Sequence, residues 1–297
     1  MKKLCLLLAV IVTAAFGCSE DKKVNNNQNI SKANNFTNAD ELITAVINKF
    51  NAYNYQYPTL NVLQSKTYLI AKNKLVDEMF LVTISQDKLN NKSLSFSKKR
   101  NSILFFAKSK NKIWKLFPKQ ELKTTTKTKI FESPSLMSCP SLKVFKSSFK
   151  NIKLMPELTT IDNEKCYKLV CRVDKNNPLQ EEFDVFYWVT KKNLLPIKLQ
   201  TQVIIQGVKY KGTSYYYSKI VDKKYQLQKI IMISEPFDKN YLAFKNIITI
   251  KKIVHGAPFD ETLLKRPKDK NDYKKLQDYF NNLLSKYYDN KYQIKIK

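Results

Sequence analysis

The residue whose position most clearly indicates covalent chemistry is Cys18. It follows the small residue Gly17, and a basic start leads into an uncharged apolar run over residues 4–16. This run is shorter than the roughly 20 apolar residues that span a bilayer core, and the order of basic, apolar and small residues is typical of a secretory signal peptide. In bacterial lipoproteins the cysteine directly after the cut receives a diacylglyceryl group. The sequence therefore predicts a signal peptide over 1–17 and a lipid anchor on Cys18.

The alternative is an ordinary secretory signal with a chance cysteine, because Ala15 stands where the usual lipoprotein motif has leucine. Residues 18–36 are rich in Asn, Lys and Ser and contain almost no large apolar side chains. Such a stretch buries too little surface to offset the entropy of ordering it. We therefore expect a flexible tether over 18–36, followed by a folded part.

Catalytic chemistry has few candidates in the remainder of the chain. The single histidine, His255, ends a strand-like apolar run, and the four glycines cannot build a phosphate-binding loop. Adjacent carboxylates such as Glu181 and Glu182 flank predicted strands, where a solvated strand end is their ordinary environment. No pair of cysteines has the spacing of zinc ligands. The sequence predicts that the protein is not an enzyme and has no catalytic residue, no metal site and no cofactor.

Three cysteines, Cys139, Cys166 and Cys171, lie in the predicted folded part. Because Cys166 and Cys171 are five residues apart, they point to opposite faces of one strand and cannot join. One disulfide from Cys139 to either of them is compatible with an oxidising compartment.

The formal charge of +28 raises the question of a nucleic-acid partner. Only three of the 53 basic residues are arginine, the side chain that most often reads bases, and the signal directs the chain out of the cytoplasm. We therefore expect no nucleic-acid partner. Abundant Lys, Asn, Ile and Tyr are what an AT-rich genome encodes. The basic surface also suits anionic membranes, at about 1 kcal/mol for each lysine close to the surface.

A helix is predicted to open the folded part, with Thr37 as its cap and Asp40 three residues further on. Its apolar side chains recur at helical spacing, namely Leu42, Ile43, Val46, Ile47 and Phe50. From Thr59 to His255 nearly every segment is rich in β-branched and aromatic residues between short polar turns. This pattern predicts an antiparallel meander of about ten strands, the size at which a twisted sheet must curl or close.

Two segments leave alternatives open. The apolar spacing in residues 131–156 fits either a short helix crossing the sheet as a lid or a surface loop with one helical turn. Residues 267–297 are predicted to form a basic helical extension with an apolar stripe from Tyr273 to Tyr287. That helix either docks on the domain or lies on a membrane as an amphipathic helix.

Several stretches resemble bacterial outer-membrane lipoprotein-sorting proteins of the LolA/LolB-like group. KIWKLFPK (112–119) is similar to the strand that carries their W-x-x-x-P motif, and CYKLVCRV (166–173) with EEFDVFYWVTKKNLLPIKLQT (181–201) is similar to their paired strands. By order of elements the resemblance covers residues 37–266. It implies a mainly β, α+β fold, in which a large curved antiparallel sheet forms an unclosed β-barrel and helices cover its concave face.

The resemblance also implies that the apolar inner side of this sheet accepts acyl chains of lipoproteins or other lipids. The residues that we expect on this face are Phe183, Val185, Tyr187, Ile197, Leu199, Val203, Leu227, Ile231 and Ile233. Ordinary core packing is the alternative role for each of them.

These expectations describe a lipoprotein of the outer membrane that faces the periplasm or the cell exterior. It would bind lipid or lipoprotein acyl chains and act in lipid or lipoprotein sorting or sensing. The alternative is a non-enzymatic interaction or structural lipoprotein without bound lipid, which meets a protein or envelope polymer through tyrosine-rich strands such as 215–217.

Overall fold

The structure is a computed structural model of the 297-residue chain. It describes residues 35–51, 59–85, 91–97, 102–107, 112–117, 120–124, 134–137, 139, 141–177, 180–205, 207–221, 224–255 and 269–287. These residues belong to two compact units. Unit 1 takes its described residues from 1–54, 69–72 and 128–245, and unit 2 takes them from 55–68, 73–127 and 246–297.

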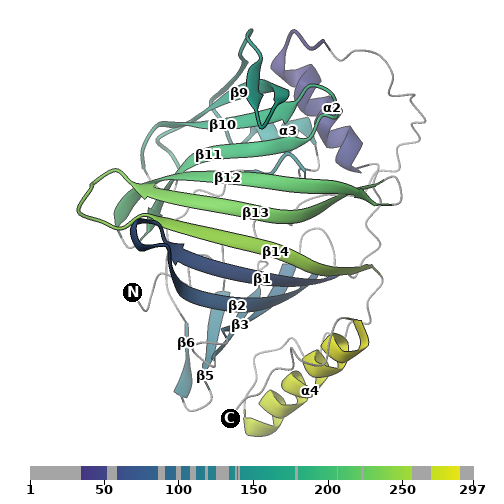
Figure 1. The fold of residues 1–297 in the computed structure, drawn as a ribbon, viewed down its shortest axis with the longest axis vertical. Helices are drawn as coiled ribbons and strands as arrows, with labels where there is room; N and C mark the ends of the chain where they lie inside the picture. Colours follow the sequence, from purple (N-terminus) through teal and green to yellow (C-terminus); the bar gives the residue numbers. More distant parts are fainter. Residues whose placement is uncertain are drawn as a thin grey trace. The chain divides into compact units, whose positions relative to one another are not determined.

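Unit 1 is an antiparallel sheet with short helices. Its strands are β7 (Asn151–Leu154), β8 (Thr159–Ile161), β9 (Glu164–Val173), β10 (Phe183–Thr190), β11 (Pro196–Ile205), β12 (Val208–Val221) and β13 (Lys224–Pro236). They follow the order β13-β12-β11-β10-β9-β7, and β8 pairs with β9 (Figure 1). The helical elements are α2 (Ala39–Asn51), the 3-10 turn η1 (Ile70–Lys72) and α3 (Leu142–Lys146). The two end strands, β13 and β7, do not pair with each other, so this path of described strands stays open.

Unit 2 is a second antiparallel path. Its strands are β1 (Thr59–Leu69), β2 (Lys74–Ser85), β3 (Asn91–Ser97), β4 (Ser102–Ala107), β5 (Lys112–Phe117), β6 (Gln120–Thr124) and β14 (Phe244–His255), in the order β6-β5-β4-β3-β2-β1-β14. Helix α4 (Lys270–Tyr287) begins after Asp269, whose carboxylate accepts the N–H groups of Asn271 and Asp272 at 2.8 and 3.0 Å. In the described part of the chain, no helix is both long enough and apolar enough to span a bilayer.

A hydrogen-bonded pair of polar residues is buried between β1 and β14, the last two strands of the unit 2 path. Ser65 on β1 donates its hydroxyl to the Oδ1 atom of Asn246 on β14 at 2.9 Å, and both residues are 1% exposed. The Nδ2 atom of Asn246 has no hydrogen-bond partner among the described residues. Buried polar groups of this kind cost free energy unless they are paired, so this part of unit 2 differs from an apolar core.

The predicted fold class is confirmed: the protein is mainly β, with a few helices and an antiparallel sheet that remains open. The region from Thr59 to His255, for which about ten strands are predicted, contains all fourteen described strands. Three strands were not predicted, namely β6, β7 and β8, which have five, four and three residues. Such short segments do not carry enough alternation to be distinguished from loops. The domain limits proposed from the sequence, 37–266 and 267–297, remain predictions, although a helix does form in the second range.

Helix α2 covers one face of the unit 1 sheet. The five side chains predicted for its apolar stripe, Leu42 to Phe50, are all 6% exposed or less. The cap differs from the prediction, because the side chain of Asn38 rather than Thr37 accepts the N–H of Glu41, at 2.9 Å. At the other end of α2, the ammonium group of Lys49 donates to the carbonyl of Asn193 in the β10–β11 turn. Burial lowers the pKa of Lys49.

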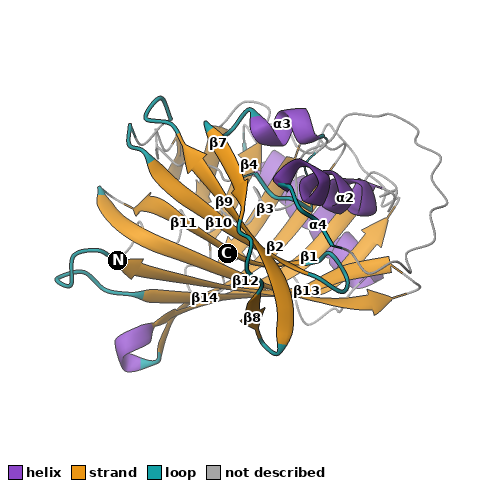
Figure 2. Cartoon of the chain, turned by 90° about the horizontal axis from the view of Figure 1, so that it is seen from above, coloured by secondary structure: helices purple, strands orange, loops and turns teal. Residues whose placement is uncertain are grey.

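The segment 131–156 contributes a second cover over the same face. Its described part contains α3, which is capped by Ser141 and lies near α2 (Figure 2). This part buries Leu136, Cys139 and Phe145 in the same core as α2. The ring of Phe145 lies 5.4 Å from that of Tyr187 on β10 and 5.2 Å from that of Phe149. The described part of this segment therefore packs on the sheet, as the first alternative requires, whereas α3 itself has only five residues, close to the single helical turn of the second.

Truncation of Phe145 tests whether this cover is part of the core. We expect Phe145→Ala to lower the free energy of unfolding by about 3–5 kcal/mol, because a fully buried ring leaves a cavity. The matched control is Val144→Ala, whose side chain is 41% exposed, with an expected change below about 0.5 kcal/mol. Urea unfolding followed by circular dichroism measures both. Similar losses in the two variants would contradict the packing described here.

Candidate functional site

Pairing across unit 1 sorts the side chains of β9 to β13 onto two faces. We call the face that packs against α2 and α3 the inner face and the opposite one the outer face. Residues directly opposite each other on paired strands share a face, and neighbours along a strand do not. One inner row consists of Leu169, Tyr187, Leu199, Ser214 and Met232. The adjacent outer row consists of Lys168, Trp188, Lys198, Tyr215 and Ile231.

Burial along the inner row shows where the helices stop covering the sheet. Leu169 on β9 is 0% exposed and Tyr187 on β10 is 2% exposed, both in the core with α2 and α3. From β11 onward, Leu199, Ser214 and Met232 are only half-buried. The inner face of β11 to β13 therefore carries apolar and small polar side chains that the described helices cover only in part.

The structure divides the nine residues predicted for an apolar inner face. Phe183, Val185 and Tyr187 are core residues under the helices, and Leu199 packs against that core at its margin. Val203 belongs to a separate small cluster with Tyr210 and Phe244. Ile197 is half-buried. It lies at an irregularity in the pairing of β10 with β11, where Trp188 pairs with Lys198 but Val189 pairs with Pro196.

The remaining three predicted residues are separated by a β-bulge in β13. Tyr217 pairs with Lys229, whereas Ser218 pairs with Leu227, so one extra residue shifts the alternation. Leu227 therefore faces inward with Ser218, while Ile231 and Ile233 lie opposite Tyr215 and Thr213 on the outer face. The prediction that Ile231 and Ile233 share the inner face is wrong, because strict alternation through YQLQKIIMIS ignores this bulge.

Tyr216 and Met232 are inner-face residues that the sequence prediction missed. Tyr216 lies opposite Ile230 on β13, and Met232 lies opposite Ser214. Burial raises the pKa of Tyr216 to about 12, while a hydrogen bond with Ser214 acts in the other direction. Leu199 on β11 shows which side chains face inward. Following the strand pairing from Leu199 to β12 and then to β13 finds both residues, whereas counting alternate residues along β13 alone does not.

The hydroxyl of Tyr187 is the polar group buried deepest under the helical cover. It donates to the carbonyl of Pro134 at 2.8 Å and so ties the 131–156 segment to β10. Burial raises the pKa of Tyr187 well above its usual value, and Cys171, Tyr216 and Cys139 nearby add to that shift. A phenol held protonated in this way is a structural donor and not an acid–base catalyst near neutral pH.

On the outer row, lysines alternate with aromatic rings. The Lys198 ammonium lies 4.6 Å from the centroid of Trp188 and 5.3 Å from that of Tyr215. The Lys168 ammonium lies 5.6 Å from the Trp188 centroid and 4.9 Å from that of Phe186. These distances are in the range of cation–π attraction.

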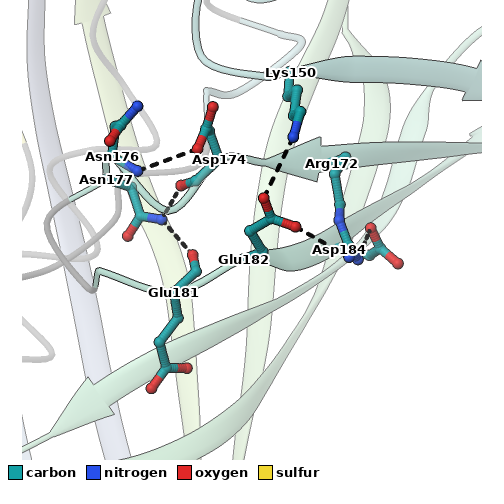
Figure 3. Close-up of polar contacts among 8 residues, drawn as sticks. All are labelled: Lys150, Arg172, Asp174, Asn176, Asn177, Glu181, Glu182 and Asp184. Carbon is teal, nitrogen blue, oxygen red and sulfur yellow. Dashed lines mark hydrogen bonds and ion pairs between the residues drawn. The ribbon is translucent and has the colours of Figure 1, made fainter.

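The β9–β10 hairpin ends in a group of ion pairs (Figure 3). Arg172 contacts Asp184 at 3.1 Å and Glu182 at 3.5 Å, and Lys150 contacts Glu182 at 3.4 Å. Glu181 pairs with Lys209. Glu181 and Glu182 thus bind different cations at the end of a strand, as expected for structural carboxylates rather than for an acid–base dyad. The described residues contain no group of three or more His, Cys, Asp or Glu side chains placed to hold a metal ion.

The three cysteines of the folded part are all buried. Cys171 faces the core opposite Val185, and Cys166 lies opposite Thr190 on the other face, so these two cannot join, as the spacing predicts. A disulfide from Cys139, left open by the sequence, is not formed. Burial raises the pKa of Cys166 to about 11, with Glu164 as a second cause, and burial also raises the pKa of Cys171.

The predicted lipid anchor lies outside the described residues, together with the signal peptide and residues 18–34. Phe36, the last residue of the predicted tether, is instead packed against the core. Its ring stands edge-on to that of Tyr167 with centroids 5.6 Å apart. The ordered fold therefore includes at least this residue of the predicted tether.

Comparison with known proteins gives a likeness of fold. No protein-family model matches the chain, and no curated protein matches its sequence. Among solved structures, it is similar to a DUF1329 family protein from Desulfovibrio piger, with a TM-score of 0.53 at 10% identity over 77% of this chain and 98% of that one. The likeness is one of fold.

Two further solved structures match with lower TM-scores. A putative outer membrane lipoprotein-sorting protein domain from Vibrio parahaemolyticus gives 0.49 at 12% identity, over 75% of this chain and 95% of that one. A LolA superfamily protein from Nitrosomonas europaea gives 0.47 at 14% identity, over 75% and 96%. The structures matched thus include two that are described as a lipoprotein-sorting protein and a LolA superfamily protein, the group that the sequence resembles.

The burial of the three cysteines predicts slow reaction with thiol reagents. A pKa of about 11 leaves Cys166 with about 100-fold less thiolate at pH 8 than a thiol of ordinary pKa, and thiolate is the reactive form. We expect alkylation of Cys139, Cys166 and Cys171, mapped by peptide mass spectrometry, to be slow in the folded chain and rapid in denaturant. Rapid labelling of the folded chain, or a disulfide-linked peptide containing Cys139, would contradict this arrangement.

Proposed function

We propose that this protein is an envelope lipoprotein that binds an acyl chain of a lipid or lipoprotein on the inner face of unit 1. The observation that carries the proposal is the partial cover of that face. Helices α2 and α3 bury the inner side of β9 and β10, whereas Leu199, Ser214 and Met232 on the next three strands remain half-buried. An apolar sheet face requires something packed against it, and an acyl chain supplies that surface.

The energetics favour a long aliphatic ligand on such a face. Each buried methylene contributes about 0.8 kcal/mol, so ten methylenes contribute roughly 8 kcal/mol before the costs of ordering and association. Ser214 and the Tyr216 hydroxyl are among the uncharged polar groups on this part of the face, and they suit the carbonyl end of an acyl ester better than a charged ligand. No residue of the site is placed for bond-breaking chemistry, and the function that we propose is non-enzymatic.

The anchor and the location are part of the same proposal. The predicted signal peptide and Cys18 support a lipid-anchored protein of the outer membrane. We infer a role in lipid or lipoprotein sorting or sensing. Native mass spectrometry of the full chain extracted from membranes in mild detergent tests it directly: co-purifying lipid supports the proposal, and a clean apo mass contradicts it.

A second candidate is an interaction lipoprotein without bound lipid, and one observation favours it. The β13–β14 turn exposes Phe237, Tyr241 and Leu242, and η1 beside it exposes Ile70, whose N–H donates to the carbonyl of Ala243 at 3.1 Å. Contiguous exposed apolar side chains of this kind mark contact surfaces. Cross-linking in cells that yields one dominant protein partner, with no lipid in the native mass, would favour this candidate.

Substitutions at two neighbouring residues of β13 distinguish an effect on lipid binding from an effect on the stability of the fold. Met232 faces inward and Ile231 outward, and both are half-buried. We expect Met232→Gln to raise the dissociation constant for a fluorescent fatty acid roughly five- to thirtyfold, which corresponds to about 1–2 kcal/mol of lost apolar contact. Ile231→Gln, the matched control, should change it less than about twofold.

Binding is measured by fluorescence titration, and the unfolding midpoints of both variants are compared with that of the parent chain. Equal weakening by the two substitutions, at equal stability, would exclude the inner face of β11 to β13 as the binding surface.

A further inference from the structure

The outer face of unit 1 carries an ordered array of lysines and aromatic rings. Lys168 on β9, Lys198 on β11 and Lys229 on β13 stand on every second strand of the path β9-β10-β11-β12-β13. Each ammonium lies over a ring: those of Lys168 and Lys198 over Trp188, and that of Lys229 over Tyr217 at 5.3 Å. Because strands are spaced about 4.8 Å apart, successive lysines stand about 10 Å from one another.

The acidic residues of the same face neutralise only part of its charge. Asp184 is paired with Arg172, Glu181 with Lys209, and Glu235 lies opposite Lys211. Glu164 lies on the same face of β9, four residues before Lys168, and Asp162 is close enough to Tyr217 to add to the rise that burial causes in its pKa. The neighbours that the array lysines contact are rings instead. Lys168, Lys198 and Lys229 are half-buried, and Lys153, on β7 opposite Val170, adds an exposed cation to this face. The face is therefore an area of excess positive charge whose ammonium groups are already positioned by the folded sheet.

The geometry of the array favours a planar partner over a linear one. From β7 to β13 the lysines extend roughly 24 Å across the strands, and their offsets along the strands extend roughly 14 Å. A groove that binds single-stranded nucleic acid instead has its positive charge along one line, and its aromatic rings are free to stack on bases. Here Trp188 is only 7% exposed, and both of its neighbouring strands place a lysine ammonium over its ring. Stacking on a nucleobase or a sugar ring is therefore blocked.

The composition of the face matches that of protein surfaces at a membrane–water boundary. At such surfaces the aliphatic part of a lysine side chain lies along apolar surface while its ammonium group reaches outward. Tyrosine and tryptophan are enriched at the level of the lipid headgroups. Ile231 and Ile233, which the register places here, supply half-buried apolar surface between the lysines. We propose that the outer face of unit 1 docks on an anionic phospholipid bilayer, with Lys168, Lys198 and Lys229 as its main contacts. This docking does not depend on whether a lipid occupies the inner face.

Lysine footprinting tests this contact on the intact chain. The chain is treated with an amine-acetylating reagent alone, with phosphatidylcholine vesicles, and with vesicles containing equal phosphatidylcholine and phosphatidylglycerol. Modification of each lysine is measured by peptide mass spectrometry. We expect acetylation of Lys168, Lys198 and Lys229 to fall at least about threefold with the anionic vesicles only, and to recover in high salt. The control set is Lys143, Lys175 and Lys239, which are exposed on α3 and on two turns, and it should change little.

A pair of variants measures the contribution to affinity. Both carry Cys18→Ala, so that no lipid anchor contributes, and the salt-sensitive part of vesicle flotation is compared. Each lysine near an anionic surface contributes about fivefold, so K168Q/K198Q/K229Q should lose between about tenfold and 100-fold. K143Q/K175Q/K239Q, with the same change in net charge, should lose less than about threefold.

Three outcomes would overturn the proposal. In the first, anionic vesicles protect the two lysine sets equally from acetylation. In the second, uncharged vesicles protect the array lysines. In the third, soluble polyglutamate protects the array lysines and anionic vesicles do not. The fatty-acid titration described above is unaffected by any of them, so failure here leaves the inner-face proposal standing. Because the footprint is taken on the unsubstituted chain, a folding defect in either variant does not remove the test.

Discussion

A β-strand directs successive side chains to opposite faces. In unit 1 the pairing register carries this alternation across five strands, apart from an irregularity after Trp188 and the bulge in β13. Leu169, Tyr187 and Leu199 therefore share one surface, while their immediate neighbours Lys168, Trp188 and Lys198 share the other. A slip of one residue in any of these pairs would exchange an apolar face for a charged one. Both functional surfaces inferred for this protein, one apolar and partly covered, the other basic and aromatic, follow from that single geometric constraint.

The extent of the cover on the inner face is set by the size of the elements that supply it. Helix α2 has thirteen residues and α3 has five, and their apolar side chains converge on β7, β9 and β10. The contacts of Phe145 with Tyr187 and Phe149 close this part of the core. Nothing of comparable size among the described residues of unit 1 reaches β11 to β13, where the inner side chains remain half-buried.

The sequence predicts some of these features well and others poorly, for identifiable reasons. The apolar stripe of α2 and the long strands are strongly periodic, so their existence follows from pattern alone. The bulge at Gln228 leaves no comparable trace, because a glutamine between Leu227 and Lys229 has the pattern of an ordinary polar strand position. As a result, alternation places Ile231 and Ile233 on the wrong face. The lysine–aromatic array was also not predictable, since it depends on which residues of four separate hairpins become opposite neighbours.

The order of the chain has a consequence for how the protein assembles. In unit 2 the strand β1 pairs with β14, and the Ser65–Asn246 hydrogen bond that joins them spans 181 residues. Unit 1 is likewise incomplete until α2, near the start, meets strands encoded a hundred residues later. Until residue 246 has been made and has emerged, the first strand lacks its partner on one side. That exposed edge is a site for mispairing, so protection by a chaperone would matter most before that point.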